Sequence, residues 1–435
     1  MKSFGFERIL TSGDYDHQLT CVNVFSCDSR EILYDTRTRG RDQDASVIES
    51  VNCESGEIRL IYKNDTGARG AVVTCHPTER KACFIKGLDH PEVNGKYHLT
   101  CRQGGIVSLD DMSDFCNIDA RDVHAPYTPG ALRGGSHVHV FSPDGKYISD
   151  TYDDAVCHRR GIEHDGPEGE ANLRNVQINS LGRPVSVPDL PGNHSGSAFT
   201  YVAARLHSDP KPGSDEIRTC EEETFIGQNG YVDAGGIRHA HALAAIGEVR
   251  TADGTPVQEV YIIHLPEGDI RDGDGPLVGT PTTRPLPPTG CEQIRLTHLS
   301  ERKIPGIRGT RHWLRTTPDG RWVAFFAMDD DGILQAFKAD TATGRVVQVS
   351  HNTFSAQSQM TLSPDGLFMY YAAGGSLVRT HMEEGYTDIL LAPGEHPINE
   401  GPVVVSPDGK CIAYTRIIPG TVMRRQQICT FTLTD

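Results

Sequence analysis

The 435-residue sequence contains no apolar run of about 18 residues, the length that a helix needs to cross a membrane. Its start, Met1–Phe6, also lacks an apolar stretch of signal-peptide length, so we expect a cytoplasmic protein. The twelve cysteines are spread singly, with no Cys-x-x-Cys pair. This distribution indicates reduced thiols rather than a disulfide framework.

Positive charge is scarce, with 42 Lys and Arg against 58 Asp and Glu and a net charge of −16. This balance argues against nucleic acid or an anionic membrane as a partner. The nucleophile elbow, the phosphate-binding loop and the dinucleotide fingerprint are missing too. The acidic run Asp272–Gly275 resembles a calcium loop, but Ile270 stands where the first acidic ligand belongs and no Glu closes the loop.

One turn sequence, ending in Pro-Asp-Gly, recurs along the chain. Copies occur at Phe141–Gly145, Thr317–Gly320, Ser363–Gly366 and Ser406–Gly409. Pro318, Pro364 and Pro407 are 46 and 43 residues apart. A period of about 40–45 residues with four strands per unit is typical of propeller blades.

Worn copies of the turn complete the count of units. Phe25–Ser29 and Cys75–Thr78 resemble it, and units near positions 27, 77, 143, 200–264, 318, 364 and 407 give seven. The last unit lacks a fourth strand, which Phe6–Ser12 at the other end of the chain would supply. We therefore predict an all-β, seven-bladed β-propeller closed by pairing of the N- and C-terminal segments.

A single propeller domain is expected to take up residues 1–435. Three stretches depart from the repeat, near 157–195, 206–236 and 266–290. Insertions of this length are either functional lids or surface loops that cost little to close.

Histidines precede several of the turns at similar distances. The strand before the turn lines the central channel of a propeller, so equal offsets from the proline place residues at similar heights around the axis. His137 and His139 lie six and four residues before Pro143, and His312 lies six before Pro318. Because His137 and His139 alternate with Val138, we expect both to point to one side of their strand.

These histidines are candidate metal ligands. A metal site needs three or four ligands, which His137, His139, His241, His312 and Gln359 would supply. The alternative is that they are structural histidines. His239, the partner of His241 in a second His-x-His pair, lies in the irregular fourth unit.

Arginines flank the same positions. Arg133 precedes the first His-x-His pair, and Arg308, Arg311 and Arg315 surround His312. Guanidinium groups bind carboxylates through two parallel hydrogen bonds, so we expect an acidic sugar as ligand. The predicted substrate contacts are Arg133, Arg308 and Gln357. The alternative, strongest for Arg315, is pairing with the many carboxylates of the chain.

The stretch Ala125–Pro143 resembles the YidR-type family of bacterial TolB-like propellers. Further segments carry the same resemblance, which runs nearly the full length: Pro212–Ile217, His241-Ala242-Leu243 and Arg311-His312-Trp313. The resemblance implies a TolB-like or WD40-like propeller fold more than an activity.

A more distant resemblance is to oligogalacturonate lyase, a seven-bladed propeller that holds manganese near the axis with histidines and a glutamine. His137 and His139 match its His-x-His, whereas Gly134 stands where its glutamine belongs, so Gln359 substitutes or the metal shell differs. The resemblance implies a divalent metal, Mn first and Zn or Ca as alternatives. It also implies β-elimination on a uronate-containing oligosaccharide in the central channel.

In that reaction the metal would acidify the proton beside the carboxylate, Arg311 or His239 would remove it, and Arg133 would orient the sugar acid. Two alternatives stay open. The ring could be a non-catalytic scaffold for a protein or ligand, or a metal-dependent hydrolase or isomerase of a sugar derivative.

Overall fold

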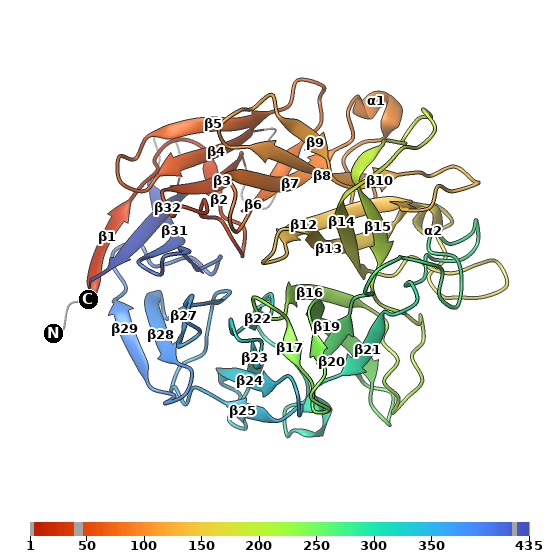
Figure 1. Cartoon of the computed structure of the whole chain (residues 1–435). Coiled ribbons are helices and arrows are strands. Elements are labelled where there is room, and N and C mark those ends of the chain that lie inside the picture. Colours follow the sequence, from red (N-terminus) through yellow and green to blue (C-terminus); the bar gives the residue numbers. More distant parts are fainter. Residues whose placement is uncertain (1–3, 39–46, 420–423, 435) are drawn as a thin grey trace.

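The computed structural model describes residues 4–38, 47–419 and 424–434. Within these ranges seven four-stranded antiparallel sheets stand around a central axis, which confirms the seven-bladed β-propeller (Figure 1). The first strand of each blade lies nearest the axis and the fourth lies at the rim.

The blades follow one another along the chain. Blade 1 comprises β2 (Asp16–Gln18), β3 (Glu31–Arg37), β4 (Val47–Asn52) and β5 (Ile58–Lys63). Blade 2 comprises β6 (Gly70–Cys75), β7 (Lys81–Gly87), β8 (Arg102–Ser108) and β9 (Phe115–Asn117). Blade 3 comprises β12 (Gly134–Phe141), β13 (Tyr147–Asp154), β14 (Asn175–Val185) and β15 (Gly196–Val202). Blade 4 comprises β16 (Cys220–Phe225), β19 (Ala242–Arg250), β20 (Pro256–His264) and β21 (Glu292–Arg295). Blade 5 comprises β22 (Arg315–Thr316), β23 (Trp322–Met328), β24 (Leu334–Asp340) and β25 (Val346–Gln348). Blade 6 comprises β26 (Thr361–Leu362), β27 (Phe368–Ala373), β28 (Ser376–His381) and β29 (Thr387–Leu391). Blade 7 comprises β30 (Val404–Val405), β31 (Cys411–Pro419), β32 (Arg424–Leu433) and β1 (Gly5–Ile9).

The two ends of the chain close the ring. Strand β1 pairs antiparallel with β32, from Gly5 opposite Leu433 to Ile9 opposite Cys429, and so becomes the fourth strand of blade 7 (Figure 1). Glu7 on β1 accepts hydrogen bonds from the Tyr414 hydroxyl and the Arg416 guanidinium on β31. This confirms the predicted closure and leaves blade 7 without a bare edge.

The repeated turn is held by one hydrogen-bond pattern. In blade 3 the Ser142 hydroxyl donates to Asp144 (2.7 Å) and accepts from the Tyr147 amide (3.0 Å). The same hydroxyl-to-carboxylate bond recurs at Ser26–Asp28, Thr317–Asp319, Ser363–Asp365 and Ser406–Asp408. Gly145 closes the turn at φ 70°, where a side chain would be strained. The worn copy in blade 1 therefore forms the same turn.

Apolar side chains fill the interfaces between neighbouring blades. Tyr370 and Leu377 of blade 6 pack with Ile412 and Phe431 of blade 7, and similar clusters join the other blades. Burying each such side chain stabilises the ring by about 1.5–3 kcal/mol. The alternation of apolar residues along the strands thus produces contacts between blades rather than one central core.

The axis itself is partly filled. Cys21, Val72, Val138 and Trp313 from four blades form a buried apolar cluster. At the end of the axis that carries the Pro-Asp-Gly turns, called here the turn end, residues of all seven blades line a cavity of 380 Å³. The opposite end is called the channel mouth.

The departures from the repeat are smaller than expected. The predicted insertion at 157–195 contains β14, and that at 206–236 contains the first strand of blade 4, β16. Residues 266–290 form a connection between β20 and β21. The elements outside the blades are α1 (Pro91–Asn94), α2 (Ala155–Arg159), the 3₁₀ turn Leu299–Glu301, β10 (Ala120–Arg121), β11 (Ala131–Leu132), β17 (Tyr231–Val232) and β18 (Arg238–His239).

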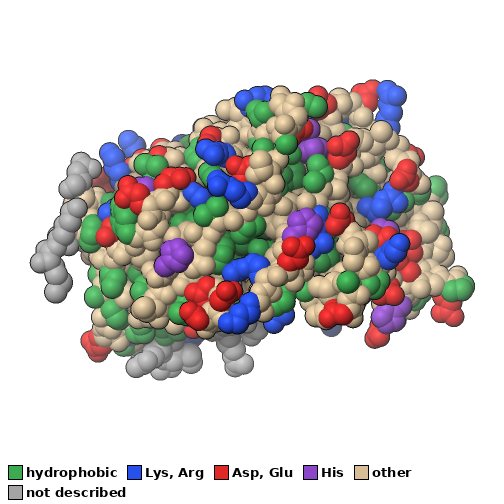
Figure 2. Space-filling model, turned by 90° about the horizontal axis from the view of Figure 1, so that it is seen from below, with side chains coloured by type: hydrophobic (Ala, Val, Ile, Leu, Met, Phe, Trp, Pro, Cys, Tyr) green, Lys and Arg blue, Asp and Glu red, His purple; other side chains and the backbone are tan. Residues whose placement is uncertain are grey.

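The outer surface mixes both signs of charge. Seen from the side, acidic and basic side chains are interspersed over the ring (Figure 2).

All twelve cysteines are unpaired. Among the described residues, no helix is both long and apolar enough to cross a membrane.

Candidate functional site

Three neighbouring inner strands, β6, β12 and β16, share a bulge. Each shifts its register by one residue, and each carries a non-glycine residue in the left-handed region: Val72 (φ 60°), Val138 (φ 60°) and Glu222 (φ 56°). Such residues are uncommon and cluster at functional sites. The bulges lie toward the channel mouth and decide which side chains reach it.

The bulge in β12 overturns the expectation that His137 and His139 share a side. His137 pairs with Thr151 and Val140 pairs with Ser149, so the two residues Val138 and His139 stand opposite one partner residue. Residues that pair directly point to the same face, so His137 lies on the face of Thr151 and His139 on the opposite face. The simple alternation fails because Val138 is the extra residue.

His139 is enclosed between blades 2 and 3. It is fully buried, and its Nε2 lies 3.0 Å from the Ser136 hydroxyl and 3.8 Å from an Asp150 oxygen. Burial lowers the pKa of His139 to about 3 and raises the pKa of Asp150 well above its usual range. At neutral pH this is therefore an uncharged imidazole inside the wall of the ring.

His137 instead lies among arginines at the channel mouth. Its Nδ1 is 3.3 Å from Arg102, which begins β8. Burial and then the charges of Arg102, Arg174 and Arg311 hold the pKa of His137 well below its usual range. The local field is thus positive, although the whole chain is acidic, and His137 is neutral at pH 7.

Carboxylates hold two of these arginines. Arg174 lies 3.2 Å from Asp153 and 3.4 Å from Glu221, while Arg311 lies 3.6 Å from Glu221 and also donates to Glu222. Burial, followed by the neighbouring Glu221 charge, raises the pKa of Glu222. The side chain of Arg311 is 49 % exposed, with its guanidinium carbon 4.7 Å from the Trp313 ring centre.

Arg102 has a different environment. No carboxylate among the described residues pairs with its guanidinium, which lies 5.1 Å from the Tyr97 ring centre. Its Nε is buried and has no hydrogen-bond partner in the described part of the chain. We call Arg102, His137, Arg174, Glu221, Glu222 and Arg311 the channel-mouth cluster. Within the described residues, Arg102 is the cation of this cluster that has no carboxylate partner, so an incoming anion would bind to Arg102.

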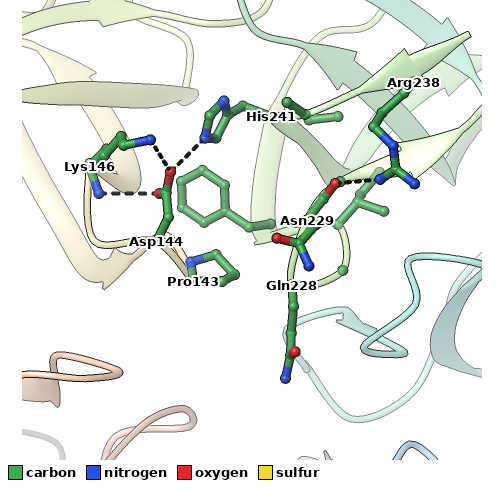
Figure 3. Close-up of a pocket in the computed structure, with 13 residues that line it drawn as sticks. Pro143, Asp144, Lys146, Gln228, Asn229, Arg238 and His241 are labelled. Carbon is green, nitrogen blue, oxygen red and sulfur yellow. Dashed lines mark hydrogen bonds and ion pairs between the residues drawn. The ribbon is translucent and has the colours of Figure 1, made fainter.

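Two further predicted ligands lie elsewhere. His312 is buried beside the axis, where its Nδ1 contacts the Thr310 carbonyl (2.8 Å) and its Nε2 accepts from the Phe326 amide (3.0 Å). His241 pairs with Asp144 at 2.9 Å in a cavity at the turn end (Figure 3). Both ring nitrogens of His312 are thus engaged by backbone.

The remaining predicted site residues also lie apart from one another. His239, the candidate base, stacks on His264 at 3.7 Å and pairs with Asp233 at 2.9 Å on the hairpin β17–β18. Arg308 is exposed and donates to the Pro305 carbonyl, and Gln357 is exposed before β26. Gln359 is half-buried, with its Oε1 unpartnered within the described residues. Of the predicted site residues, the structure brings together His137 and Arg311.

Arg133 does not reach the channel mouth. It is fully buried, holds Asp154 at 2.8 Å and donates to the Thr280 and Thr283 carbonyls. The predicted role in orienting a sugar acid therefore has no support from this position. Its guanidinium instead ties the connection between β20 and β21 to blade 3.

The predicted metal ligands do not surround a common point. His137 and His139 lie on opposite faces, His312 is bonded to backbone, and His241 lies at the other end of the ring. Among the residues that the structure describes, no group of three or more His, Cys, Asp or Glu is arranged to hold a metal ion. These side chains do not fit a manganese site.

Sequence reasoning missed Arg102, Arg174, Glu221 and Glu222. The turn after β16 has no proline, so the rule that counts residues back from the turn proline gives no position for Glu221–Glu223. Counting back from Gly227 as from the turn prolines places Glu221 level with His137 and Glu222 level with Val138. Arg102 and Arg174 enter from the starts of β8 and β14, for which the repeat gives no offset.

The comparisons with known proteins come from sequence and from structure. Residues 69–194 match a family described as "Protein of unknown function (DUF3748)". The chain is 36% identical over 410 residues to "Uncharacterized protein YidR" of Escherichia coli (strain K12), covering 93% of this chain and 94% of that protein. The matched family segment includes Arg102, His137 and Arg174.

Solved propellers resemble the whole chain. An oligogalacturonate lyase in complex with manganese superposes with a TM-score of 0.54 and 11% identity, covering 100% of this chain and 99% of that one. An oligogalacturonate lyase from Vibrio parahaemolyticus gives 0.52 and 10% identity over 99% and 94%. At such identities the likeness shows the shared fold.

Proposed function

The chain belongs to the family of YidR from Escherichia coli, and on that premise we propose that it binds and cleaves a small uronate-containing oligosaccharide at the channel-mouth cluster. The reaction that we propose is β-elimination. The fold shared with oligogalacturonate lyase supports the substrate class, and the arginines at the channel mouth support the charge of the ligand.

The single observation that carries the proposal is the contact between Arg102 and His137. A guanidinium without a carboxylate partner, with a buried donor to spare, lies 3.3 Å from an imidazole that is neutral at pH 7. The guanidinium group offers paired N–H donors to a carboxylate. Because guanidinium only donates, the lone pair of the neutral imidazole is at Nδ1, and this nitrogen accepts the proton once Arg102 turns its donors to the carboxylate.

Each member of the cluster has a part in the proposed reaction. Arg102, with Arg311 across the mouth, binds the uronate carboxylate and stabilises the negative charge that develops when the neighbouring C–H bond breaks. Arg311 does not serve as the base, because guanidinium stays protonated in proteins. His137 accepts the proton, taking the place of the predicted bases Arg311 and His239.

The carbon–hydrogen electron pair then forms the double bond within the sugar ring, and the glycosidic oxygen leaves with its bonding pair and takes a proton from water. No step is assigned to a metal ion, because the predicted ligands do not converge. Glu221 and Glu222 hold Arg174 and Arg311 in position and touch no reacting atom.

The reaction is tested by its ultraviolet product. Wild-type protein incubated with digalacturonate and trigalacturonate is expected to generate the absorbance of an unsaturated uronide. A His137→Gln variant should lose at least about 100-fold in rate, since general base catalysis contributes about 10²–10⁴-fold. Arg271→Gln, an exposed arginine outside the cluster, is the matched control.

Equal rates in wild type and His137→Gln would overturn the assignment of the base. Binding of these oligosaccharides without any turnover would replace the enzyme by a binding protein for acidic saccharides. Absence of both binding and turnover would overturn the whole proposal.

A further inference from the structure

A second cavity lies between blades 3 and 4 at the turn end. Its volume is 590 Å³, within the range of about 300–1,000 Å³ common for small-molecule sites. One wall is the turn Pro143–Lys146 of blade 3, and the other is formed by the two ends of the hairpin β17–β18. This hairpin is inserted between β16 and β19, and no other blade of the described chain carries a strand pair at this position.

The carboxylate in this cavity is already neutralised. Asp144 accepts from the His241 ring at 2.9 Å and lies 3.1 Å from the Lys146 ammonium. Its second oxygen accepts from the Ser142 hydroxyl and the Lys146 amide. Figure 3 shows Lys146, Asp144 and His241 together on one side of the cavity. These contacts leave Asp144 without excess negative charge to repel an anion.

Arg238 faces them from the hairpin. It is exposed, and no carboxylate in the described part of the chain pairs with it, whereas its Nη1 donates to the Asn229 carbonyl at 3.0 Å (Figure 3). One guanidinium edge is thus fixed by backbone, and the other remains available to a ligand carboxylate. In a chain of net charge −16, such a cation in a cavity is a local anion site.

The rest of the lining suits a hydroxylated molecule. The exposed amides of Gln228 and Asn229 border the cavity together with the exposed Lys146 ammonium. Pro143 and Ile226 supply apolar surface. Amide groups exchange hydrogen bonds with hydroxyls, and the apolar patches pack against the C–H faces of a sugar ring.

We propose that this cavity is a second binding site, for a small hydroxylated carboxylate of the sugar-acid class, with Arg238 as the carboxylate ligand. It is separate from the channel-mouth cluster, because Pro143 lies in the turn that follows the end of β12, whereas His137 lies in the half of that strand nearer the channel mouth. The inference does not depend on β-elimination, which concerns the other end of the ring.

The test is a titration of the full chain with D-galacturonate, followed by calorimetry and by saturation-transfer NMR, which detects weak binding. Wild type is expected to bind at two sites. Arg238→Gln should weaken one site at least about tenfold and leave the other unchanged, as expected from the loss of one charged hydrogen bond. Arg102→Gln should do the reverse. Arg271→Gln, an exposed arginine outside both sites, is the matched control.

The outcomes separate this inference from the proposed function. A single binding event that Arg102→Gln removes and Arg238→Gln leaves intact overturns the second site alone. A single event that only Arg238→Gln removes supports the second site and contradicts the proposed function. Equal binding of neutral D-galactose at the Arg238-dependent site, tighter binding of inorganic phosphate there, or no binding up to millimolar D-galacturonate overturns the inference.

Discussion

Arg102 is the residue on which anion binding at the channel mouth depends most directly. Its guanidinium contacts His137 and has no carboxylate partner within the described residues. We expect Arg102→Gln to weaken digalacturonate binding by about 10- to 100-fold, because a hydrogen bond to a charged group is worth about 1.5–3 kcal/mol.

Calorimetry on wild type and on the exposed-arginine variant Arg271→Gln supplies the comparison for Arg102→Gln. The melting temperature should stay nearly constant, since the substitution leaves no buried carboxylate unpaired. Unchanged affinity in Arg102→Gln would place the anion elsewhere.

His137 should report the bound carboxylate through its pKa. In the free protein, burial and three arginines hold this pKa well below its usual range. A bound carboxylate offsets the positive field, so the pKa of His137 rises on binding and a proton is taken up. Affinity for digalacturonate should therefore increase as the pH falls from about 7.5 to 5.5.

Dissociation constants measured at several pH values in wild type and in His137→Gln test this linkage. The variant should show a flatter pH dependence. The same dependence in both proteins, or weaker binding at low pH in wild type, would contradict the assignment.

At the scale of elements, strand β1 is expected to stabilise the ring through Glu7. This carboxylate accepts from Tyr414 and from Arg416, whose side chain is 5 % exposed. Glu7→Ala leaves that guanidinium largely buried without its carboxylate partner, which should cost about 1–3 kcal/mol in the free energy of unfolding.

Urea unfolding followed by circular dichroism measures this cost. Phe6→Thr on the same strand is the control, because Phe6 is 58 % exposed and Thr also favours strands. A loss in Glu7→Ala no larger than in the control would mean that β1 contributes little to closure.

Elements with the full turn sequence could be read from the sequence closely. The turn Thr317–Gly320 is followed by β23, Trp322–Met328, whose β-branched and aromatic residues are typical of a strand. Strands β14 and β16 lie within the stretches whose sequence departs from the repeat. Both are rich in Asn, Gln or Glu, and their polar side chains are buried between blades. Apolar alternation does not reveal a strand of this kind.

The candidate site was harder to predict because of the bulges. Val138 adopts φ 60° although valine favours extended backbone. The sequence has no glycine or asparagine at this position that would have indicated a left-handed residue. The alternation rule then placed His139 beside His137, when packing between blades 2 and 3 encloses it. Arg102 reaches His137 from another blade, and the ring geometry alone shows that contact.

At the scale of the whole molecule, the ring brings arginine side chains from different blades together at the channel mouth. We expect that EDTA treatment leaves the affinity for digalacturonate and the melting temperature unchanged, because the binding groups are arginines. Calorimetry before and after chelation, with manganese added back, is the measurement. Binding that EDTA abolishes and Mn²⁺ restores would contradict this expectation and favour the metal-dependent lyase.

The buried titratable groups make the stability of the ring depend on pH. Burial lowers the pKa of several histidines: to about 4 for His17 and His312, to about 3 for His139 and His194, and well below the usual range for His137. Unfolding lets these five bind protons below about pH 6.5, which destabilises the folded chain as the pH falls. Burial of carboxyl groups acts in the opposite sense, raising the pKa to about 6 for Asp119, to about 7 for Glu223 and strongly for Asp150.

The pKa values of His76, His98 and His264 are also lowered and that of Glu222 is raised, so the groups that take up protons on unfolding outnumber those that release them. The free energy of unfolding should therefore fall as the pH is lowered from about 6 to 4.5. Urea unfolding at fixed pH values, followed by tryptophan fluorescence, measures the slope. In His139→Gln one titrating group is gone, and the slope should shrink by roughly 1.4 kcal/mol per pH unit. A flat or rising stability on acidification would mean that these imidazoles are charged within the ring.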